Sequence, residues 1–241
     1  MKIAFLAGTS GLVGMQLLHQ LLKNKSYEYV ISVGRRKLAL KHKKLIQLTG
    51  DLKKINNWEW EDQINAESLG GEYADLTDKM KNGEIQIDCF CSIGTTIKKA
   101  GSKDNFYSID HDLVYQIALA AKEHGAKQFL FVSALGADAK SGVFYNKVKG
   151  EIEELLKTIG FDYLGIFRPS LLLGDRKETR FGEELAKIFM KPLSWLKIWD
   201  KGRPIYDYQV AKSMVYKALE GLNSKEKVEI ISSAQMQNLS K

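Results

Sequence analysis

The chain has 241 residues and 44% of them are hydrophobic, which suits one domain, or one domain with a cap, around a sizeable core. Its formal net charge is +7 at pH 7, which agrees with an acidic ligand. The basic residues are spread along the chain, so we expect a solvated lysine surface and no nucleic-acid partner. No apolar run in the sequence is long enough to span a membrane.

Cys89 and Cys91, the two cysteines, lie within an apolar run. Neither they nor the four histidines have a spacing typical of metal ligands, so we expect buried reduced thiols, no metal and a cytoplasmic protein. The first seven residues resemble a weak signal peptide. Their short apolar stretch runs directly into a glycine turn, so we expect no such peptide.

The glycine-rich turn near the start of the chain is the strongest motif. It follows an apolar run over residues 3–6 that predicts a buried strand, and it precedes leucines at helical spacing. A strand, a glycine turn and a helix in this order can hold the pyrophosphate of a dinucleotide at the helix N-terminus. The predicted cofactor residues here are Gly8, Thr9, Ser10, Gly11, Leu12, Val13 and Gly14.

The spacing of this turn is G-x-x-G-x-x-G, not the common G-x-G-x-x-G. Gly8 would permit the tight turn, Gly11 would let backbone approach the pyrophosphate, and Gly14 would let the helix pack closely on the sheet. Three glycines can also form a plain tight turn. The position between strand and helix favours the dinucleotide interpretation.

The second predicted strand, residues 29–33, ends in Gly34, Arg35 and Arg36. Sites that prefer NAD usually place an acidic residue near this point, for the ribose 2′-hydroxyl, whereas a guanidinium can hold a 2′-phosphate. We therefore predict NADP(H) as the cofactor. The alternative is that both arginines are merely solvated charges.

Two further loops follow predicted strands. The strand at residues 44–48 is followed by Asp51 and Leu52, where an acid could meet the adenine edge, although the local sequence alone indicates only a turn. Residues 53–84 predict helix and loop without a site. The strand at residues 85–91 precedes a loop of small residues where open α/β sheets bind ligands, with Ser92, Gly94, Thr95 and Thr96 as candidates.

The catalytic candidates come from the next strand and helix. A long helix is expected over residues 106–124, with Asp110 and Asp112 near a helix start as cap and solvated charge. The strand at residues 128–132 ends in Ser133, which could hydrogen-bond a substrate oxygen.

Tyr145 and Lys149 then form Y-x-x-x-K on a helix predicted over residues 144–158, which places both on one helical face. A phenol has an ordinary pKa of about 10, and a neighbouring ammonium would lower it, so Tyr145 could act as a general acid and base. Lys149 would also hold the nicotinamide ribose. Tyr208 and Lys212 repeat the spacing, but no strand ending in serine precedes them at the right distance, and we interpret them as helix surface.

The last part of the chain predicts a strand over residues 162–167 that ends in Arg168 and Pro169, and a final strand over residues 228–232. Strands and helices alternate throughout, which predicts an α/β, Rossmann-type, doubly wound parallel sheet. We expect a single NAD(P)-binding domain over residues 1–241, with residues 175–205 as a small substrate-side cap.

Taken together, the glycine turn, Ser133, Tyr145, Lys149 and Arg168-Pro169 resemble the atypical short-chain dehydrogenases/reductases. Longer segments are similar to the Tat-interacting-protein oxidoreductases: Gly94-Thr95-Thr96, Gly136-Ala137-Asp138, residues 145–151 and Phe167-Arg168-Pro169. The resemblance implies a Rossmann fold, NADPH binding that includes Arg168 and Pro169, and the roles given above for the three catalytic candidates. It implies no particular substrate, and animal members are discussed as regulatory proteins as much as enzymes.

Two functional hypotheses follow. The first is an NADPH-dependent oxidoreductase that acts on a small carbonyl or alcohol substrate, with Tyr145 as general acid/base. The second is a regulatory binding protein that senses NADPH, with little or no turnover. A protein partner or a homodimer stays open in both.

Overall fold

The computed structural model describes residues 1–68, 71–174 and 203–241, and it is built on a parallel sheet with the strand order β3-β2-β1-β4-β5-β6-β9. This order confirms the predicted doubly wound fold. A second, two-stranded sheet pairs β7 (Leu172–Leu173) with β8 (Ile205–Tyr206). The strands of the main sheet are β1 (Lys2–Ala7), β2 (Tyr29–Gly34), β3 (Leu45–Thr49), β4 (Gln86–Cys91), β5 (Ala126–Val132), β6 (Tyr163–Arg168) and β9 (Val228–Ser232).

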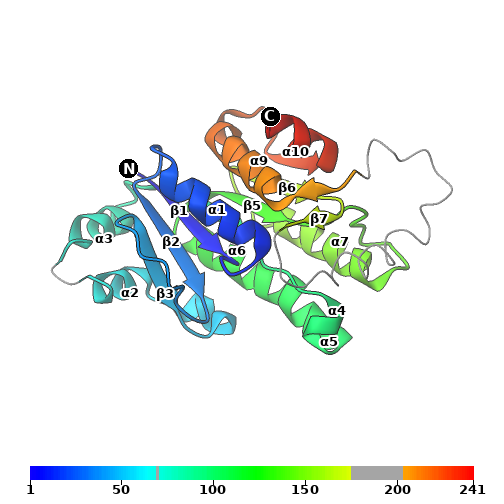
Figure 1. Cartoon of the computed structure of the whole chain (residues 1–241). Helices are drawn as coiled ribbons and strands as arrows, with labels where there is room; N and C mark the ends of the chain where they lie inside the picture. Colours follow the sequence, from blue (N-terminus) through cyan, green and yellow to red (C-terminus); the bar gives the residue numbers. More distant parts are fainter. Residues whose placement is uncertain (69–70, 175–202) are drawn as a thin grey trace.

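Helices cover both faces of this sheet (Figure 1). Along β1, Ala4 and Leu6 pack toward one face, whereas Ile3 and Phe5 pack toward the other, because successive side chains of a strand point to opposite sides. The first face carries α1 (Leu12–Lys23), α9 (Asp207–Glu220) and α10 (Ser233–Leu239); the second carries η1 (Leu52–Asn57), α2 (Trp60–Ala66), α3 (Ala74–Lys81), α6 (Leu113–Glu123) and α7 (Phe144–Lys157). The short elements are α4 (Ile97–Ala100), α5 (Lys103–Tyr107), η2 (Ser108–Asp112) and η4 (Gly221–Asn223).

The polar stretch at residues 53–84 contributes to the core through Trp60, which is fully buried. Its indole lies between two rings, with centroids 4.1 Å from Phe5 and 4.0 Å from His124, and both pairs are stacked. Aromatic pairs in this geometry contribute beyond the area they bury. The prediction of helix and loop for this stretch is confirmed, and its tryptophan anchors the helices to the central strand.

The long helix expected over residues 106–124 is present as one helical run over residues 103–123, with a π-helical turn inside it. The chain forms α5, then a π-helical turn at η2, then α6. The expectation that Asp110 is a helix cap and a solvated charge is wrong, because its side chain is fully buried. The hydrogen bond of a π turn spans i to i+5, one residue more than in an α-helix, and here Asp110 faces the interior, where Lys149 supplies the opposite charge.

Cys89 and Cys91 are buried and free, as predicted. In the three described ranges, no helix has both the length and the apolar character needed to cross a bilayer. The proposed cap lies mainly in residues 175–202, outside the described residues, so the cap and the single-domain assignment stay predictions.

Candidate active site

The predicted site residues follow strands of one parallel sheet, so the loops that carry them gather at its carboxyl edge. β1 lies between β2 and β4, and the chain winds outward in both directions from the β1–β4 junction. Open α/β sheets bind ligands in the crevice at such a switch point. The glycine turn after β1 and the loop after β4 lie on the two sides of this junction.

The glycine turn is closely packed against the end of β4. Gly8 has a φ of +92°, a conformation that favours glycine. A Cβ at Gly14 would lie 2.0 Å from the carbonyl oxygen of Gly8, so only glycine allows α1 to start here. Ser92 Oγ donates to the carbonyl oxygen of Ala7 at 3.2 Å, which ties the two loops together.

The N-terminus of α1 fits an anion. Within this helix, which is described throughout, no side chain caps the N-terminus and no acidic residue occupies the first turn. The first backbone N–H groups of a helix lack partners within it and favour negative charge. Thr9 is buried and its Oγ1 accepts a hydrogen bond from Ser32 Oγ at 3.0 Å, whereas Ser10 is exposed.

The next two predicted loops differ in character. Arg35 and Arg36 directly follow β2 and are exposed, which leaves them accessible to a ligand at this edge. The carboxylate of Asp51 caps η1 by accepting a hydrogen bond from the Lys53 backbone N–H at 3.1 Å, and Leu52 belongs to the core. Both residues therefore have structural roles here, and their predicted contact with a cofactor stays a prediction.

A buried ion pair lies beside the predicted general acid/base. On α7, Tyr145 and Lys149 share a face, and Lys149 Nζ lies 2.8 Å from Asp110 Oδ1. Asp110 Oδ2 accepts a hydrogen bond of 2.8 Å from the Thr95 backbone N–H. Gly94 lies over the pair, because a Cβ there would be 3.2 Å from Asp110 Oδ1 and 3.6 Å from Lys149 Nζ.

The charges of this cluster act on one another. Burial is the largest single influence on Lys149 and opposes its charge, but Asp110, Tyr145 and Cys91 together outweigh burial, so the pKa of Lys149 lies above its ordinary value. Burial also raises the pKa of Tyr145; the ammonium of Lys149 acts in the opposite sense, and Asp110 raises it further. Tyr145 is therefore a protonated phenol, and Lys149 an ammonium, at neutral pH.

Ser133 and Arg168 meet at a second buried carboxylate. Glu153 is fully buried, and its oxygens accept hydrogen bonds from Ser133 Oγ and from the guanidinium of Arg168, whose Nε lies 3.0 Å from Oε1. The backbone of this edge is also joined, since the Leu135 N–H donates to the carbonyl oxygen of Pro169 at 2.9 Å. Glu153, which lies one helical turn after Lys149 on α7, thus holds both Ser133 and Arg168.

Two functional candidates were missed in the sequence. Glu153 stands four residues after Lys149 and eight after Tyr145, a spacing that places all three on one face of α7. That spacing could have identified Glu153. Asp110 had no comparable signal, because the π turn that directs it inward is not encoded in a spacing.

Thr96 and the second Y-x-x-x-K have other roles. Thr96 Oγ1 caps α4 by accepting from the Lys99 backbone N–H at 3.2 Å. Tyr208 is 47% exposed, and Lys212 Nζ donates to the carbonyl oxygen of Ser240 at 3.0 Å. The interpretation of Tyr208 and Lys212 as helix surface is confirmed.

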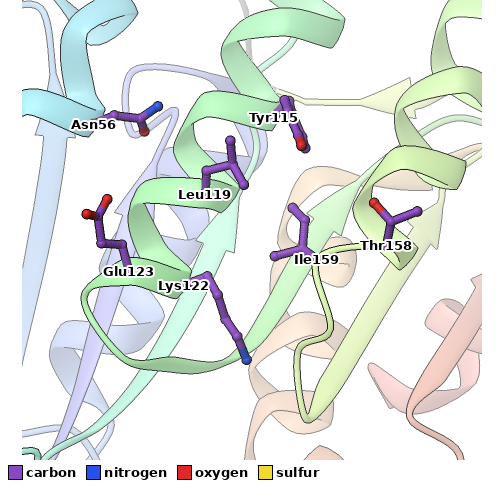
Figure 2. A pocket seen from close by; sticks show the side chains of 7 residues that line it. All are labelled: Asn56, Tyr115, Leu119, Lys122, Glu123, Thr158 and Ile159. Atoms are coloured by element: carbon purple, nitrogen blue, oxygen red, sulfur yellow. The ribbon is translucent and has the colours of Figure 1, made fainter.

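A recess on the helical face lies apart from this site (Figure 2). Asn56 of η1, Tyr115 and Leu119 of α6, and Thr158 and Ile159 after α7 line it. Thr158, the C-cap of α7, lies 13 positions after Tyr145, about 20 Å along the helix at about 1.5 Å per residue. None of the predicted site residues lines the recess.

The chain matches the model of the "NAD dependent epimerase/dehydratase family" over residues 4–231. It is 36% identical to protein HTATIP2 of Rattus norvegicus over 196 residues, which cover 80% of this chain and 73% of that protein. It is 31% identical to the mitochondrial protein FMP52 of Candida albicans over 231 residues, which cover 94% of this chain and 92% of that protein.

Solved structures of low sequence identity share the fold. MoeE5 in complex with UDP-glucose and NAD superposes with a TM-score of 0.62 at 13% identity, covering 96% of this chain and 75% of that one. WbmH of Bordetella bronchiseptica in complex with NAD⁺ superposes with a TM-score of 0.62 at 16% identity, covering 97% and 76%. The chain therefore belongs to the NAD dependent epimerase/dehydratase family, and HTATIP2 and FMP52 are among its relatives.

Proposed function

We propose that the chain is an NADP(H)-dependent oxidoreductase that transfers a hydride between the nicotinamide and a small carbonyl or alcohol substrate. The observation that carries the proposal is the position of Tyr145 beside the Lys149–Asp110 ion pair, at the same sheet edge as the glycine turn. A phenol next to a buried ammonium is a suitable proton donor and acceptor at a reacting oxygen.

The residues present fit a dinucleotide. Gly14 can only be glycine, because of the 2.0 Å approach to the Gly8 carbonyl oxygen, and the uncapped start of α1 offers free N–H groups to a pyrophosphate. The loop from Ser92 to Thr96 would border the nicotinamide half, with Lys149 at the ribose. We keep Arg168 and Pro169, which lie at the same edge of the sheet, as proposed cofactor-binding residues.

The preference for NADP(H) depends on Arg35 and Arg36. Both follow β2, both are exposed, and a guanidinium can hold a 2′-phosphate through two parallel hydrogen bonds. The family name and the solved structures that share the fold refer to NAD, so the choice of NADP(H) is argued from these two arginines and from the resemblance given above.

The roles of the chain's own residues follow from their geometry. When bound, the nicotinamide would supply or accept the hydride. Tyr145 Oη would give its proton to the substrate oxygen during reduction and take it back during oxidation, and Lys149 would stabilise the phenolate left in between. Ser133 Oγ donates to Glu153 in this structure; to hydrogen-bond a substrate carbonyl oxygen, which only accepts, its hydroxyl would have to turn its proton from Glu153 to that oxygen.

The experiment for the catalytic role compares Tyr145→Phe with Tyr208→Phe. We expect Tyr145→Phe to lower substrate-dependent oxidation of NADPH, across a panel of small carbonyl compounds, by about 100-fold or more. Tyr208→Phe is the matched control, since Tyr208 is exposed and outside the site, and should keep full turnover. Equal turnover of wild type and Tyr145→Phe on an active compound would refute the mechanism.

The experiment for the cofactor measures thermal shifts with NADPH and NADH. A ligand at a free concentration of about a hundred times its dissociation constant stabilises a protein by about 2.7 kcal/mol. Replacing Arg35 and Arg36 by alanine should weaken NADPH binding by about 10- to 100-fold, the value of a hydrogen bond to a charged group, and leave NADH binding unchanged. The control replaces Lys41 and Lys43, which are exposed in the following loop, by alanine. It removes the same amount of charge and should preserve the preference for NADPH over NADH.

The regulatory alternative makes a different prediction for the same measurements. A sensor of NADPH would show the thermal shift without turnover that depends on Tyr145, and its affinity for a partner would change with NADPH. Equal affinity for a partner with and without nucleotide would rule it out.

The cytoplasmic location stays a prediction, since several relatives are named as mitochondrial proteins.

A further inference from the structure

Asn146 directly follows Tyr145 on α7, and its side of the helix faces the loop after β5. The backbone carbonyl oxygen of Asn146 accepts a hydrogen bond from the Asp138 N–H at 3.0 Å. One turn further along, a Cβ at Gly150 would lie 2.1 Å from the backbone nitrogen of Ala139. The loop therefore packs directly on this side of α7, next to the predicted general acid/base.

The side-chain oxygen of Asn146 lacks a hydrogen-bond donor. Its Oδ1 is buried, and no donor reaches it from the residues that the structure describes. The Asp138 N–H is already used by the backbone carbonyl oxygen of Asn146, so this contact between loop and helix does not need the amide. A buried acceptor without a donor is costly, and alanine is the better helix former. The amide is therefore better suited to a ligand than to the local fold.

Gly136 leaves a way to this amide. It is exposed and has a φ of +82°, and a Cβ there would lie 3.1 Å from Asn146 Nδ2 and 3.7 Å from Oδ1. The positive φ alone favours glycine at this position. Because a glycine carries no Cβ, a ligand group can approach the amide over its backbone.

Other buried side-chain atoms without a hydrogen bond lie away from this edge or have an ionic partner. Asp110 Oδ1 is paired with Lys149. Those that remain in the three described ranges lie on the helical face, after α2, or near the first residues of β5 and β6: Asn56, Trp60, Ser68, Gln128 and Tyr163. Of this set, Asn146 is the one beside the residue proposed to transfer the proton.

We propose that the amide of Asn146 binds a hydroxyl group of the substrate and thereby selects hydroxylated ketones and aldehydes over their unsubstituted counterparts. This inference rests on the proposed function. An amide offers an acceptor and two donors, and a hydroxyl can satisfy either end because it both donates and accepts. A carboxylate only accepts and would leave Oδ1 without a donor. Asn146 is thus a specificity-determining residue, and Tyr145 performs the proton transfer.

The test measures NADPH oxidation with pairs of ketones in which a methyl group replaces the hydroxyl. The pairs are hydroxyacetone with butanone, and longer hydroxyketones with the matching alkanones. We expect the wild type to have the higher kcat/KM for the hydroxylated member. In Asn146→Leu, which replaces the amide by an apolar group of similar size, this preference should fall about tenfold or more, because the hydroxyl loses its partner.

Two further variants separate the amide from other effects of the substitution. Asn146→Asp keeps an acceptor for the hydroxyl and should retain most of the preference. Asn65→Leu is the control, because the Asn65 amide lies in α2 and accepts a hydrogen bond from Thr77 Oγ1 at 3.1 Å, and it should keep the preference of the wild type. If Asn146→Leu does not fold, Asn146→Ala takes its place in the same assay.

Urea unfolding of nucleotide-free Asn146→Ala gives a readout that is independent of activity. Since Oδ1 has no donor among the described residues and alanine favours a helix, this variant should unfold at the same urea concentration as the wild type or at a higher one. A lower midpoint would show that the amide stabilises the fold, and it would overturn the inference.

The ketone pairs also separate this inference from the proposed function. Turnover with the same preference in wild type, Asn146→Leu and Asn146→Ala would overturn the role of Asn146 and keep the oxidoreductase. If no ketone is turned over, thermal shifts of the NADPH-bound protein decide. A larger shift with the hydroxyketone that is lost in Asn146→Ala would keep the hydroxyl site and remove the oxidoreductase, and equal shifts would overturn both.

Discussion

Replacing Arg168 by methionine leaves the buried carboxylate of Glu153 without its counter-charge. Glu153 is fully buried, whereas the Arg168 side chain is 27% exposed. Removing one partner of a buried pair costs about 3–5 kcal/mol, and exposed pairs contribute at most about 1 kcal/mol. Because Arg168 is partly solvated, we expect the lower end, about 3 kcal/mol, which is a large share of the 5–15 kcal/mol typical of a domain.

Urea unfolding of wild type and Arg168→Met measures this loss, provided that the m-value stays constant. The control is the double variant Glu153→Gln, Arg168→Met, which removes both charges and should regain most of the lost stability. A double variant no more stable than Arg168→Met would refute the reasoning.

Two other substitutions test the glycine turn and the buried thiols. Gly14→Ala should abolish the NADPH-dependent thermal shift and destabilise the fold, because its Cβ would lie 2.0 Å from the Gly8 carbonyl oxygen, although alanine is the better helix former by about 1 kcal/mol. The control is Gly142→Ala, whose Cβ meets nothing within 4 Å; it should change neither the thermal shift nor the stability. Normal NADPH binding by Gly14→Ala would contradict the close packing of Gly14 on Gly8. Burial raises the pKa of Cys91 to about 12 from about 9, so its contribution to stability is complete below pH 9 and is lost as the pH rises toward 12. Relative to Cys91→Ala, the wild type should lose about 1.4 kcal/mol between pH 8 and pH 10 in urea unfolding, and parallel stability curves would show that the thiol ionises freely in the folded state.

The local pattern of residues was sufficient for the fold and for the edge that carries the site. Alternating apolar strands and amphipathic helices define a parallel sheet, and in a parallel sheet the loops after all strands share one edge. Gly8, Gly14, Tyr145 and Lys149 could be recognised because their spacing reflects local geometry, a turn or a helical face.

The partners of the site residues were decided by tertiary structure alone. Asp110 lies 39 residues before Lys149 in the sequence, and only the π turn and the packing of η2 on α7 bring its carboxylate to the ammonium. Glu153 similarly reaches Ser133 and Arg168 through the adjacency of β5 and β6. Burial makes each of these charges depend on a partner from another element, and such pairing between distant segments leaves no periodic signal in the sequence.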